Sequence, residues 1–514
     1  MNIYLYGPPG SGKSSVGKIL AGNLNLPFFD LDQKIEELSK LSIPEIFSAS
    51  GEAAFREIER NTLEGILKMS SAVIALGGGA LLDQRNRELV HASGVLFCLN
   101  APLEVLKKRL QEDAPNRPLL SGNLDNKLSD LLSKRATHYG SFENQINTAE
   151  LTPEGAAWKI QVTIGRFYLR GMGNGYEVRV KEGQLIEIGN ALLEQGLKGP
   201  VALVTDDNVG SYYGELVLKS LTDAGFKTRY LSLKPGESSK NIETVNQIWD
   251  SFLEGGLERG STVIALGGGV IGDMSGFAAS TYMRGVAWVC VPTSLLAMVD
   301  SSLGGKTAID LPQGKNLVGT FHAPRLVWVD PQTLMTLPEI ELRNGLAEVV
   351  KHGVIGDLEL FEMCESGWGV VRQKMSEIVR RAIGVKVRVI LEDPYEKGIR
   401  QVLNLGHTIG HGVEIASNFQ LMHGEAVSIG MVAAARISEG IGLAQNGLSR
   451  RIEQALRQLG LPVEIPAGID LDTMNRAMLF DKKKTNGKLR FALPVQPVEM
   501  KYGIEVENWE KFIK

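Results

Sequence analysis

Residues 73–79 have the sequence VIALGGG, and the same seven letters return at residues 263–269. Each copy is a short apolar run with branched side chains that ends in glycines. This pattern is typical of a buried parallel strand whose backbone comes close to a ligand. The flanks differ, because ALLDQ follows the first copy and VIGDM the second, whereas a duplicated segment would keep similarity there. We therefore interpret the heptapeptide as one local structure that serves two different ligand-binding sites.

Similar apolar runs accompany both copies up to about residue 330. Segments with helical periodicity lie between them, which predicts parallel strands joined by helical crossovers. Beyond residue 334 the chain has long amphipathic segments and is predicted to be mostly helical. The fold class is thus α/β, followed by a helical region. The predicted strands are NIYLY, SAVIAL, GVLFCL, VALVTD, STVIAL, VAWVCVP and RLVWVD.

The length of 514 residues suggests about three domains. The 55 Lys and Arg nearly balance the 59 Asp and Glu, so we expect no nucleic acid and no membrane as partner. The chain enters a glycine loop by residue 7 and has no apolar stretch of about 18 residues, so we expect neither a signal peptide nor a spanning helix. Three widely spaced cysteines predict buried thiols in a reducing cytoplasm. They are Cys98, Cys290 and Cys364.

The segment GPPGSGKS at residues 7–14 fits the pattern GxxxxGKS, between an apolar run and a helical segment. Its glycines allow the backbone to wrap a polyphosphate. Lys13 supplies a charge to the outer phosphates, and the Ser14 hydroxyl can bind Mg²⁺. A plain glycine-rich turn is the alternative, which the strand and helix context disfavours. The predicted ATP contacts here are Gly10, Ser11, Gly12, Lys13, Ser14 and Ser15.

Two carboxylates and several arginines follow this loop. Asp30 and Asp32 lie two positions apart after an apolar pair, so their side chains would reach different partners. Each arginine alone is most often a surface charge. Together these residues resemble shikimate kinase, over residues 1–165. The arginines are Arg56, Arg109, Arg117 and Arg135.

That resemblance implies a P-loop kinase domain that transfers the γ-phosphate of ATP to shikimate. Asp30 would hold Mg²⁺ with Ser14, and Asp32 would take the substrate hydroxyl. Arg56 and Arg135 would bind the shikimate carboxylate beside Gly77, Gly78 and Gly79. Lys13 and Arg117 would neutralise the transferring phosphate, and Arg109 would lie near the adenine.

A histidine-rich stretch marks the helical half. His407 and His411 are four residues apart and thus on one helical face, and His423 lies within 17 residues of His407. Glu348 and Lys351 share a face of an earlier segment. Two imidazoles and a carboxylate suit Zn²⁺ or Co²⁺, and the residues alone leave open whether His407 and His411 both bind it. Thr408 stands where a zinc protease would have glutamate, which excludes that class.

The second glycine segment and the polar loop at residues 293–316 are typical of ligand-binding backbone. With the histidines they resemble 3-dehydroquinate synthase, over about residues 176–514. The resemblance implies Glu348, His407 and His423 as metal ligands, with His411 free for proton transfer or contact with the substrate. It implies an NAD site at Asp206, Asn208, Glu237, Lys240, Gly269, Val270, Asp273, Thr293, Ser294, Lys306, Lys315, Thr333 and Thr336. It places the substrate at Arg284, Asp300, Asn316, Lys351, Lys386, Arg400, Asn404 and Lys482, with Lys306 and Lys315 where substrate and nicotinamide meet.

The domains expected are a kinase at residues 1–165, a linker at 166–175, a Rossmann-like NAD domain at 176–333 and a helical metal- and substrate-binding domain at 334–514. The implied second reaction converts 3-deoxy-D-arabino-heptulosonate 7-phosphate to 3-dehydroquinate and phosphate, with NAD regenerated in each turnover. Both reactions lie on the route to chorismate. We expect independent turnover by the two halves and a homodimer formed through the synthase half.

Several alternatives share parts of these patterns. An NAD-dependent polyol dehydrogenase also has glycines and metal-binding histidines, but needs fewer lysines and arginines than this chain offers. Another sugar-phosphate cyclase differs mainly at Arg400 and Asn404. The first part could instead be another small-molecule kinase, such as gluconate kinase, or a regulatory nucleotide-binding module. Intact Lys13, Asp32, Arg56 and Arg135 favour a catalytic shikimate kinase.

Overall fold

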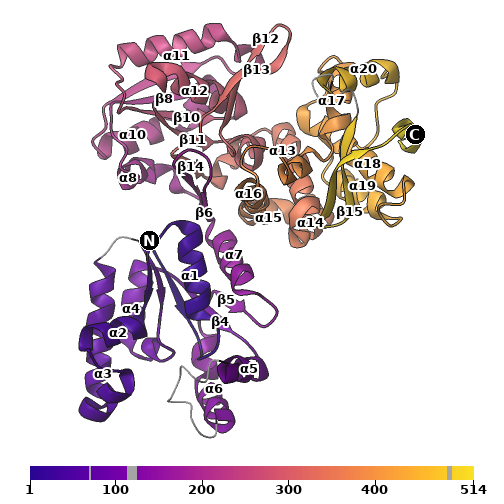
Figure 1. The fold of residues 1–514 in the computed structure, drawn as a ribbon. Coiled ribbons are helices and arrows are strands. Elements are labelled where there is room, and N and C mark those ends of the chain that lie inside the picture. The colour runs from indigo at the N-terminus through magenta and orange to yellow at the C-terminus, as the bar shows by residue number, and fades with distance from the viewer. Residues whose placement is uncertain (69–70, 113–123, 483–488, 514) are drawn as a thin grey trace. The chain divides into compact units, whose positions relative to one another are not determined.

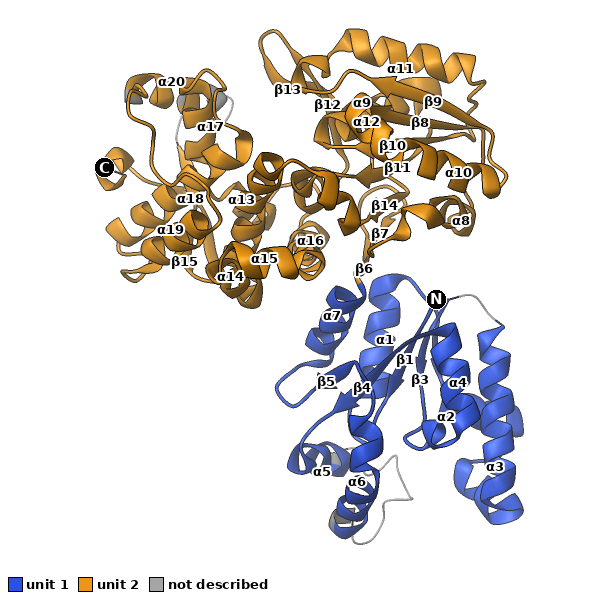
Figure 2. Ribbon diagram, turned by 180° about the vertical axis from the view of Figure 1, so that it is seen from behind, with its two compact units in different colours: residues 1–164 blue, residues 165–514 orange. Residues whose placement is uncertain are grey.

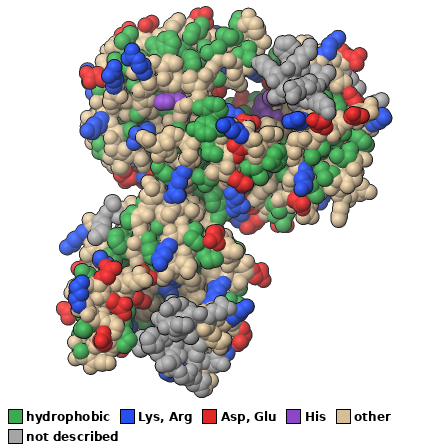
Figure 3. All heavy atoms as spheres, in the orientation of Figure 1, with side chains coloured by type: hydrophobic (Ala, Val, Ile, Leu, Met, Phe, Trp, Pro, Cys, Tyr) green, Lys and Arg blue, Asp and Glu red, His purple; other side chains and the backbone are tan. Residues whose placement is uncertain are grey.

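The computed structural model describes residues 1–68, 71–112, 124–482 and 489–513. It divides into two compact units, residues 1–164 and residues 165–514 (Figure 2). Lys and Arg side chains are interspersed with Asp and Glu on the face that Figure 3 draws. Within the described residues, no helix combines the length and the apolar character that a membrane crossing requires.

The first unit is built on a five-stranded parallel sheet (Figure 1). The first VIALGGG copy supplies β3, which pairs with β1 on one side and β2 on the other. The predicted strands NIYLY, SAVIAL and GVLFCL are thus confirmed as β1, β3 and β4. The order is β2-β3-β1-β4-β5, with β1 at Asn2–Tyr6, β2 at Phe28–Asp30, β3 at Val73–Ala75, β4 at Gly94–Asn100 and β5 at Gln145–Asn147.

Helices cover both faces of this sheet, and the alternation along β1 shows why. Ile3 and Leu5 pack in a core with α1 and α7, whereas Tyr4 and Tyr6 face the core of α2, α3 and α4. α7 begins at Pro153, and the Thr152 hydroxyl accepts a 3.1 Å hydrogen bond from a backbone N–H of its first turn. The helices are α1 (Lys13–Leu24), α2 (Leu31–Ser39), α3 (Ile43–Leu67), α4 (Gln84–Ser93), α5 (Leu103–Glu112), α6 (Leu124–Gly140) and α7 (Pro153–Ile164), with a 3-10 turn η1 at Ala80–Leu82.

The second unit begins with a seven-stranded sheet. The second VIALGGG copy supplies β10, near its centre, with parallel partners β8 and β11. Ile264 and Leu266 face a core formed with α8 and α10, and α12 packs against β10 as well. The order is β6-β7-β14-β11-β10-β8-β9, with β6 at Arg166–Leu169, β7 at Tyr176–Val180, β8 at Val201–Asp206, β9 at Thr228–Leu233, β10 at Thr262–Gly267, β11 at Ala287–Pro292 and β14 at Leu326–Val329.

Residues 166–175, expected to form a linker, are partly a strand. β6 pairs antiparallel with β7, so Arg166–Leu169 extend the sheet of the second unit. A linker would leave these backbone groups to water, but the ladder satisfies them. The alternating pattern of RFYL, with Phe167 and Leu169 buried, is the sequence signal for this strand.

Short helices and a hairpin complete the sheet domain. β12 and β13 pair antiparallel, and α12 packs against β12. The elements are α8 (Ile188–Glu194), α9 (Asp207–Val209), α10 (Glu215–Asp223), α11 (Ile242–Glu254), α12 (Gly269–Thr281), β12 (Lys306–Leu311) and β13 (Gly314–Phe321). The shorter turns are η4 (Gln184–Glu187), η5 (Gly210–Gly214), η6 (Glu237–Ser239), η7 (Tyr282–Arg284), η8 (Ala297–Ser301) and η9 (Pro331–Thr336).

The rest of the second unit is mostly helical, as predicted. α13 and α18 are buried along most of their length and pack together at its centre, where α17 and α19 also contact α18. A two-stranded hairpin, β15 with β16, was not predicted. The elements are α13 (Glu339–Gly356), α14 (Leu358–Glu365), α15 (Trp368–Gln373), α16 (Met375–Glu392), η10 (Ile399–Asn404), α17 (His407–Ala416), α18 (His423–Gly440), α19 (Leu448–Gln458), α20 (Leu471–Lys482), β15 (Arg490–Gln496), β16 (Glu499–Glu505) and η11 (Trp509–Phe512). All three cysteines are buried free thiols, also as predicted.

Candidate active sites

The phosphate loop joins β1 to α1, and its glycines are required by the backbone. Gly7 has φ 137°, and a Cβ at this position would lie 2.2 Å from the carbonyl oxygen of Leu99. Gly10 and Gly12 also have positive φ values, of 78° and 92°. The loop therefore wraps in front of the first turn of α1, where unpaired backbone N–H groups attract an anion.

Two predicted side chains of the loop have close partners. Lys13 Nζ donates to the carbonyl oxygens of Gly7 at 2.9 Å and Pro8 at 3.0 Å, so the ammonium lies over the loop. Ser14 Oγ donates a 2.5 Å hydrogen bond to Asp30 Oδ2, at the end of β2. A hydroxyl and a carboxylate in contact are hard oxygen donors of the kind that Mg²⁺ prefers.

The glycines after β3 lie among the other predicted residues of this site. A Cβ on Gly79 would lie 3.2 Å from Arg56 Nη2 and 3.5 Å from Arg135 Nη1, and one on Gly77 would lie 2.6 Å from Asp32 Oδ1. The structure thus gathers two guanidinium groups and a carboxylate around backbone that has no side chains.

Two further residues, neither of them predicted from the sequence, hold this arrangement. Buried Glu59 pairs with Arg56 at 2.8 Å. The Tyr139 hydroxyl donates to the Gly78 carbonyl oxygen at 2.8 Å, beside Arg135 Nη1 at 2.9 Å. The signal for Glu59 was its position three residues after Arg56 on one helix.

Arg109 is linked to the phosphate loop through Thr148. Its guanidinium donates to Thr148 Oγ1 at 3.0 Å and to the Thr148 carbonyl oxygen at 2.7 Å. Thr148 Oγ1 in turn donates to the Ser11 carbonyl oxygen at 3.3 Å. Arg117 lies outside the described residues.

In the second unit, predicted cofactor residues gather at the carboxyl ends of the parallel strands, where nucleotides bind in sheets of this kind. Gly268 precedes the first turn of α12, and a Cβ on Gly269 would lie 3.1 Å from Ser301 Oγ. The Thr293 N–H donates to the Gly267 carbonyl oxygen at 3.0 Å. The cradle of backbone at a helix N-terminus fits a dinucleotide pyrophosphate. A small pocket here is lined by Gly268, Gly269, Gly272, Asp273, Trp288, Cys290, Ala297, Ser301, Ser302 and Lys306.

Lys240 links this edge of the sheet to the β12–β13 hairpin. Its buried ammonium lies 2.7 Å from Asp273 Oδ2 and donates to Asn316 Oδ1 at 2.6 Å. Burial raises the pKa of Asp273 to about 6, against the opposing effect of Lys240. The pair therefore sits in an environment that disfavours charge unless both partners are present.

The other predicted cofactor residues make local contacts. Asp206 accepts backbone hydrogen bonds of 3.0 Å from Asn208 and Val209. Val270 lies in the first turn of α12, and Glu237 lies 3.9 Å from Lys240. Thr333 Oγ1 donates to the Asp330 carbonyl oxygen at 2.8 Å, and Thr336 Oγ1 lies 2.7 Å from the Tyr213 hydroxyl. Ser294 Oγ lies 3.5 Å from the position of a Cβ on Gly268.

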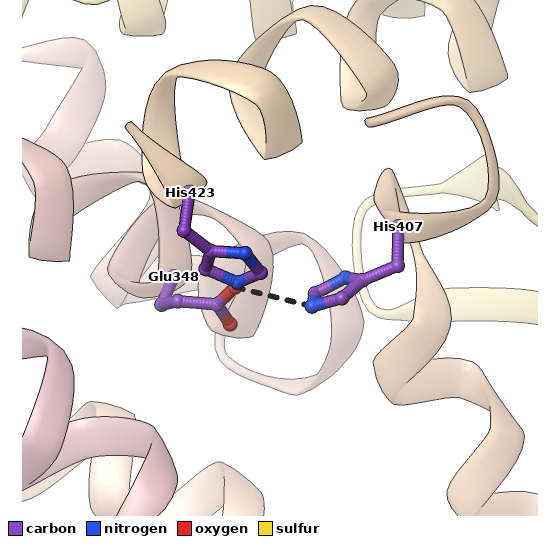
Figure 4. A group of neighbouring side chains, drawn as sticks. All are labelled: Glu348, His407 and His423. Atoms are coloured by element: carbon purple, nitrogen blue, oxygen red, sulfur yellow. Dashed lines mark ion pairs between the residues drawn. The ribbon is translucent and has the colours of Figure 1, made fainter. Parts of the chain in front are cut away.

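Three side chains from three helices form a candidate metal centre (Figure 4). His407 Nε2 and His423 Nε2 lie 3.6 and 3.7 Å from Glu348 Oε1. Glu348 is fully buried, and Oε2 forms an ion pair with buried Lys351. Neither carboxylate oxygen accepts a hydrogen bond from a described residue. The ligand atoms of Glu348, His407 and His423 lie within 4.8 Å of one another, and one carboxylate with two imidazoles is a donor set that fits a divalent metal ion.

The histidines of this centre differ in charge. Burial lowers the pKa of His407 to about 3, and Lys351 acts in the same direction, so its imidazole is neutral. Burial also disfavours charge on His423, but Glu348 and Glu414 outweigh it and raise the pKa to about 9. A metal ion at this site would therefore displace a proton from His423.

His411 belongs to a neighbouring group rather than to the set around Glu348. Its ring centroid lies 5.6 Å from that of His407, and the residue is exposed. Its donor atom groups with those of Glu414 and His423. Glu414 was missed in the sequence, although it follows His411 by three residues on one helix.

Predicted substrate residues form two clusters, and the first of them lies beside the metal centre. In the first, Lys386 Nζ donates to Asp300 Oδ1 at 2.5 Å, next to Lys351 and His352. In the second, Glu396 pairs with Lys306 and accepts a 3.4 Å hydrogen bond from Asn404.

Three more predicted substrate residues lie at different places. Arg400 is buried and donates to the Pro394 carbonyl oxygen. A Cβ on Gly304 would lie 2.3 Å from its Nη2 atom. Arg284 is exposed at the end of η7, and among the described residues no ion pair joins it to either cluster. Lys482 ends α20, and its side chain lies outside the described part of the structure.

Comparison with known proteins identifies both units. Residues 230–344 and 345–484 match the family models described as 3-dehydroquinate synthase N-terminal and C-terminal. The 3-dehydroquinate synthase of Nostoc punctiforme is 44% identical over 328 residues, which are 62% of this chain and 90% of the relative. The chain belongs to the 3-dehydroquinate synthase family. Residues 9–164 match the family model of shikimate kinase and form a shikimate kinase domain.

Solved structures of the synthase fold support the same assignment. The 2-epi-5-epi-valiolone synthase of Streptomyces hygroscopicus subsp. jinggangensis, with NAD⁺ and Zn²⁺ bound, is 31% identical with a TM-score of 0.60, over 66% of this chain and 94% of that chain. A 2-deoxy-scyllo-inosose synthase with carbaglucose-6-phosphate, NAD⁺ and Co²⁺ is 26% identical with a TM-score of 0.60, over 67% of this chain and 95% of that chain. The predicted fold class, the two family resemblances and the two enzyme activities they imply are thus confirmed.

Proposed function

We propose that the chain catalyses two separate reactions, one in each unit. The first transfers the γ-phosphate of ATP to the 3-hydroxyl of shikimate. The second converts 3-deoxy-D-arabino-heptulosonate 7-phosphate to 3-dehydroquinate and phosphate. The observation that carries this proposal is that each unit gathers its own set of reactive side chains, around Gly77–Gly79 in one and around Glu348 in the other.

In the kinase, the chain's residues position two anions and stabilise the charge of the transferring phosphate. The phosphate loop and Lys13 hold the ATP phosphates, and Ser14 with Asp30 holds Mg²⁺, which neutralises charge on the phosphates. Asp32 orients the shikimate 3-hydroxyl and accepts its proton. Arg56 and Arg135 bind the shikimate carboxylate, which suits the bidentate geometry of guanidinium groups.

In the synthase, Glu348, His407 and His423 hold a divalent ion, Zn²⁺ or Co²⁺, and the N-terminus of α12 holds the NAD pyrophosphate. When bound, the ion supplies Lewis acidity and NAD supplies a hydride acceptor. Lys351, Lys386 and Arg400 bind the anionic groups of the substrate. His411 exchanges a proton with a substrate hydroxyl oxygen, and its exposure allows that proton to reach water.

Buried cations favour this substrate over that of a polyol dehydrogenase. Lys351, Lys386 and Arg400 are 1%, 6% and 3% exposed. Glu348 pairs with Lys351 and Asp300 with Lys386, and the charges of Asp393 and Glu396 act on Arg400. Desolvated cations are costly without anions, so a substrate with phosphate and carboxylate groups complements them. Two sugar-phosphate cyclases that make other products match at lower identity, 31% and 26%, against 44% for the synthase of Nostoc punctiforme.

Location and assembly belong to the same proposal. Three buried free thiols support a reducing, cytoplasmic location. A homodimer formed through the synthase half follows from the family resemblance, and light scattering of the full chain would test it.

Two assays on the purified chain test the two reactions. The first measures shikimate-dependent ADP release, and the second measures NAD-dependent phosphate release from the heptulosonate phosphate. Activity in both is expected. Turnover of other cyclase substrates without turnover of the heptulosonate phosphate would contradict the second assignment, and ATP binding without shikimate phosphorylation would contradict the first.

A further inference from the structure

Glu414 lies between the metal centre and the β12–β13 hairpin, and neither proposed reaction uses it. It is buried, at 7% exposure, on α17. Its Oε1 atom accepts a 2.9 Å hydrogen bond from Lys315 Nζ on β13. Its Oε2 atom lies 3.8 Å from Nδ1 of His423. One carboxylate thus contacts a proposed metal ligand and a proposed cofactor residue.

The two ring nitrogens of His423 have different neighbours. Nε2 lies 3.7 Å from Glu348 Oε1, whereas Nδ1 lies 3.8 Å from Glu414 Oε2. A histidine that binds metal through one nitrogen usually donates its other N–H to a carboxylate or carbonyl, which sets the tautomer and the ring orientation. Glu414 supplies the carboxylate on the Nδ1 side of the ring.

The backbone of His423 is already fixed, so ring orientation is the freedom that remains. Gly424 N donates a 2.5 Å hydrogen bond to Asn344 Oδ1, on the helix that carries Glu348. A Cβ on Gly424 would lie 1.9 Å from the Asn344 carbonyl oxygen, so α18 begins directly against α13. Rotation about the side-chain bonds of His423 could still turn Nε2 away from Glu348.

We propose that Glu414 is a positioning residue that orients the imidazole of His423 toward the metal ion and joins Lys315 to the same centre. The inference rests on the proposed metal site. It predicts that metal affinity depends on Glu414, although Glu414 does not bind the ion. Lys315 also lies 4.8 Å from the centroid of the Phe419 ring, which further restricts where its ammonium can lie.

Metal binding by the full-length apoprotein tests this role. Zn²⁺ affinity is measured by competition with a chromophoric chelator, the coordination of Co²⁺ by its visible spectrum, and stoichiometry by elemental analysis. The variants are Glu414→Ala and Glu414→Gln. The matched control is Glu453→Ala on α19, because Glu453 pairs with Arg436 and Arg457 instead. Thermal unfolding of each apoprotein reports on folding.

Glu414→Ala is expected to weaken Zn²⁺ binding by about 10- to 100-fold and to alter the Co²⁺ spectrum. Glu414→Gln, whose amide oxygen still accepts a hydrogen bond, should lose less, and the control should match the unmodified chain. If Glu414→Ala does not fold, Glu414→Gln tests the positioning role instead, and a smaller but measurable loss of Zn²⁺ affinity supports it.

Unchanged affinity and spectrum in the folded Glu414 variants would overturn the positioning role. So would two ions per unmodified chain and one per Glu414→Ala chain, because Glu414 would then be a ligand of a second ion. An unmodified chain that binds no Zn²⁺ or Co²⁺ would instead overturn the proposed metal site itself.

Discussion

His407 Nε2 lies 3.6 Å from Glu348 Oε1, although His407 begins α17 and Glu348 lies in the middle of another helix, α13. The contact joins a neutral imidazole to a buried carboxylate whose other oxygen pairs with Lys351. The helices are thus held in a geometry that a cation would complete. Substitution of either residue should abolish the synthase activity and leave the kinase activity of the first unit unchanged.

Loss of the Zn²⁺ or Co²⁺ ion should abolish the synthase activity and leave the kinase activity unchanged. Glu348→Gln is expected to lower its kcat/KM at least about 100-fold, or about 2.7 kcal/mol of transition-state stabilisation, because the buried negative charge that attracts the ion is lost. Treatment with chelator should do the same reversibly. Phosphate release from the heptulosonate phosphate is the measurement. Retained activity in the metal-free protein would refute the role of the ion.

Lys13→Ala should remove the kinase activity, because the lysine charge over the phosphate loop stabilises the transferring phosphate. A loss in kcat of about 100-fold or more is expected. Shikimate-dependent ADP release checks it. Lys18→Ala is the matched control, since Lys18 lies on the same helix with an exposed side chain, and an equal loss in both variants would point to damage to α1.

Arg135→Met should raise the KM for shikimate about 10- to 100-fold, the effect of losing charge-assisted hydrogen bonds to a carboxylate. The KM for ATP should change little. Steady-state kinetics with each substrate varied in turn separate the two effects. The neighbouring exposed Lys134 supplies the control Lys134→Met. An increase confined to the KM for ATP would contradict the assignment.

Protonation of Glu177 should make the second unit less stable in acid. Its buried carboxylate pairs with Arg166 on β6 and with Arg179. Burial would raise its pKa, but the two arginines outweigh burial and lower it below the usual 4.5. A depressed folded-state pKa means that the stabilisation is present above about pH 4.5 and is lost as the pH falls through the folded value.

Glu177→Gln should therefore destabilise the chain by about 3 kcal/mol at pH 7, and the difference from the unmodified chain should shrink as the pH falls from about 5 toward 3. Thermal unfolding followed at several pH values measures it. A difference that stays constant with pH would show that packing, and not the charge of Glu177, is responsible.

The parallel strands were predictable because each is a short apolar run closed by glycine, proline or aspartate, as in the two VIALGGG copies. Strands without that signature were missed. β9 is only half-buried, and the β13 strand of the hairpin is largely exposed, so neither shows a continuous apolar run. β6 is short and lies where a domain boundary was expected, and only its pairing with β7 reveals it.

The site residues followed the same rule. His407, His423 and Lys13 stand in motifs whose spacing carries their chemistry. Glu414 and Glu396 belong to no motif, and their importance appears only when the fold brings them to Lys315 and Lys306. Contacts between distant segments depend on tertiary packing, which local periodicity does not contain.

Both activities measured on two single-site variants test the central claim, that one chain holds two independent active sites. Lys13→Ala should lose shikimate-dependent ADP release and keep phosphate release from the heptulosonate phosphate. His407→Ala should show the reverse. Loss of both activities from either substitution, or survival of the activity that each should remove, would contradict it.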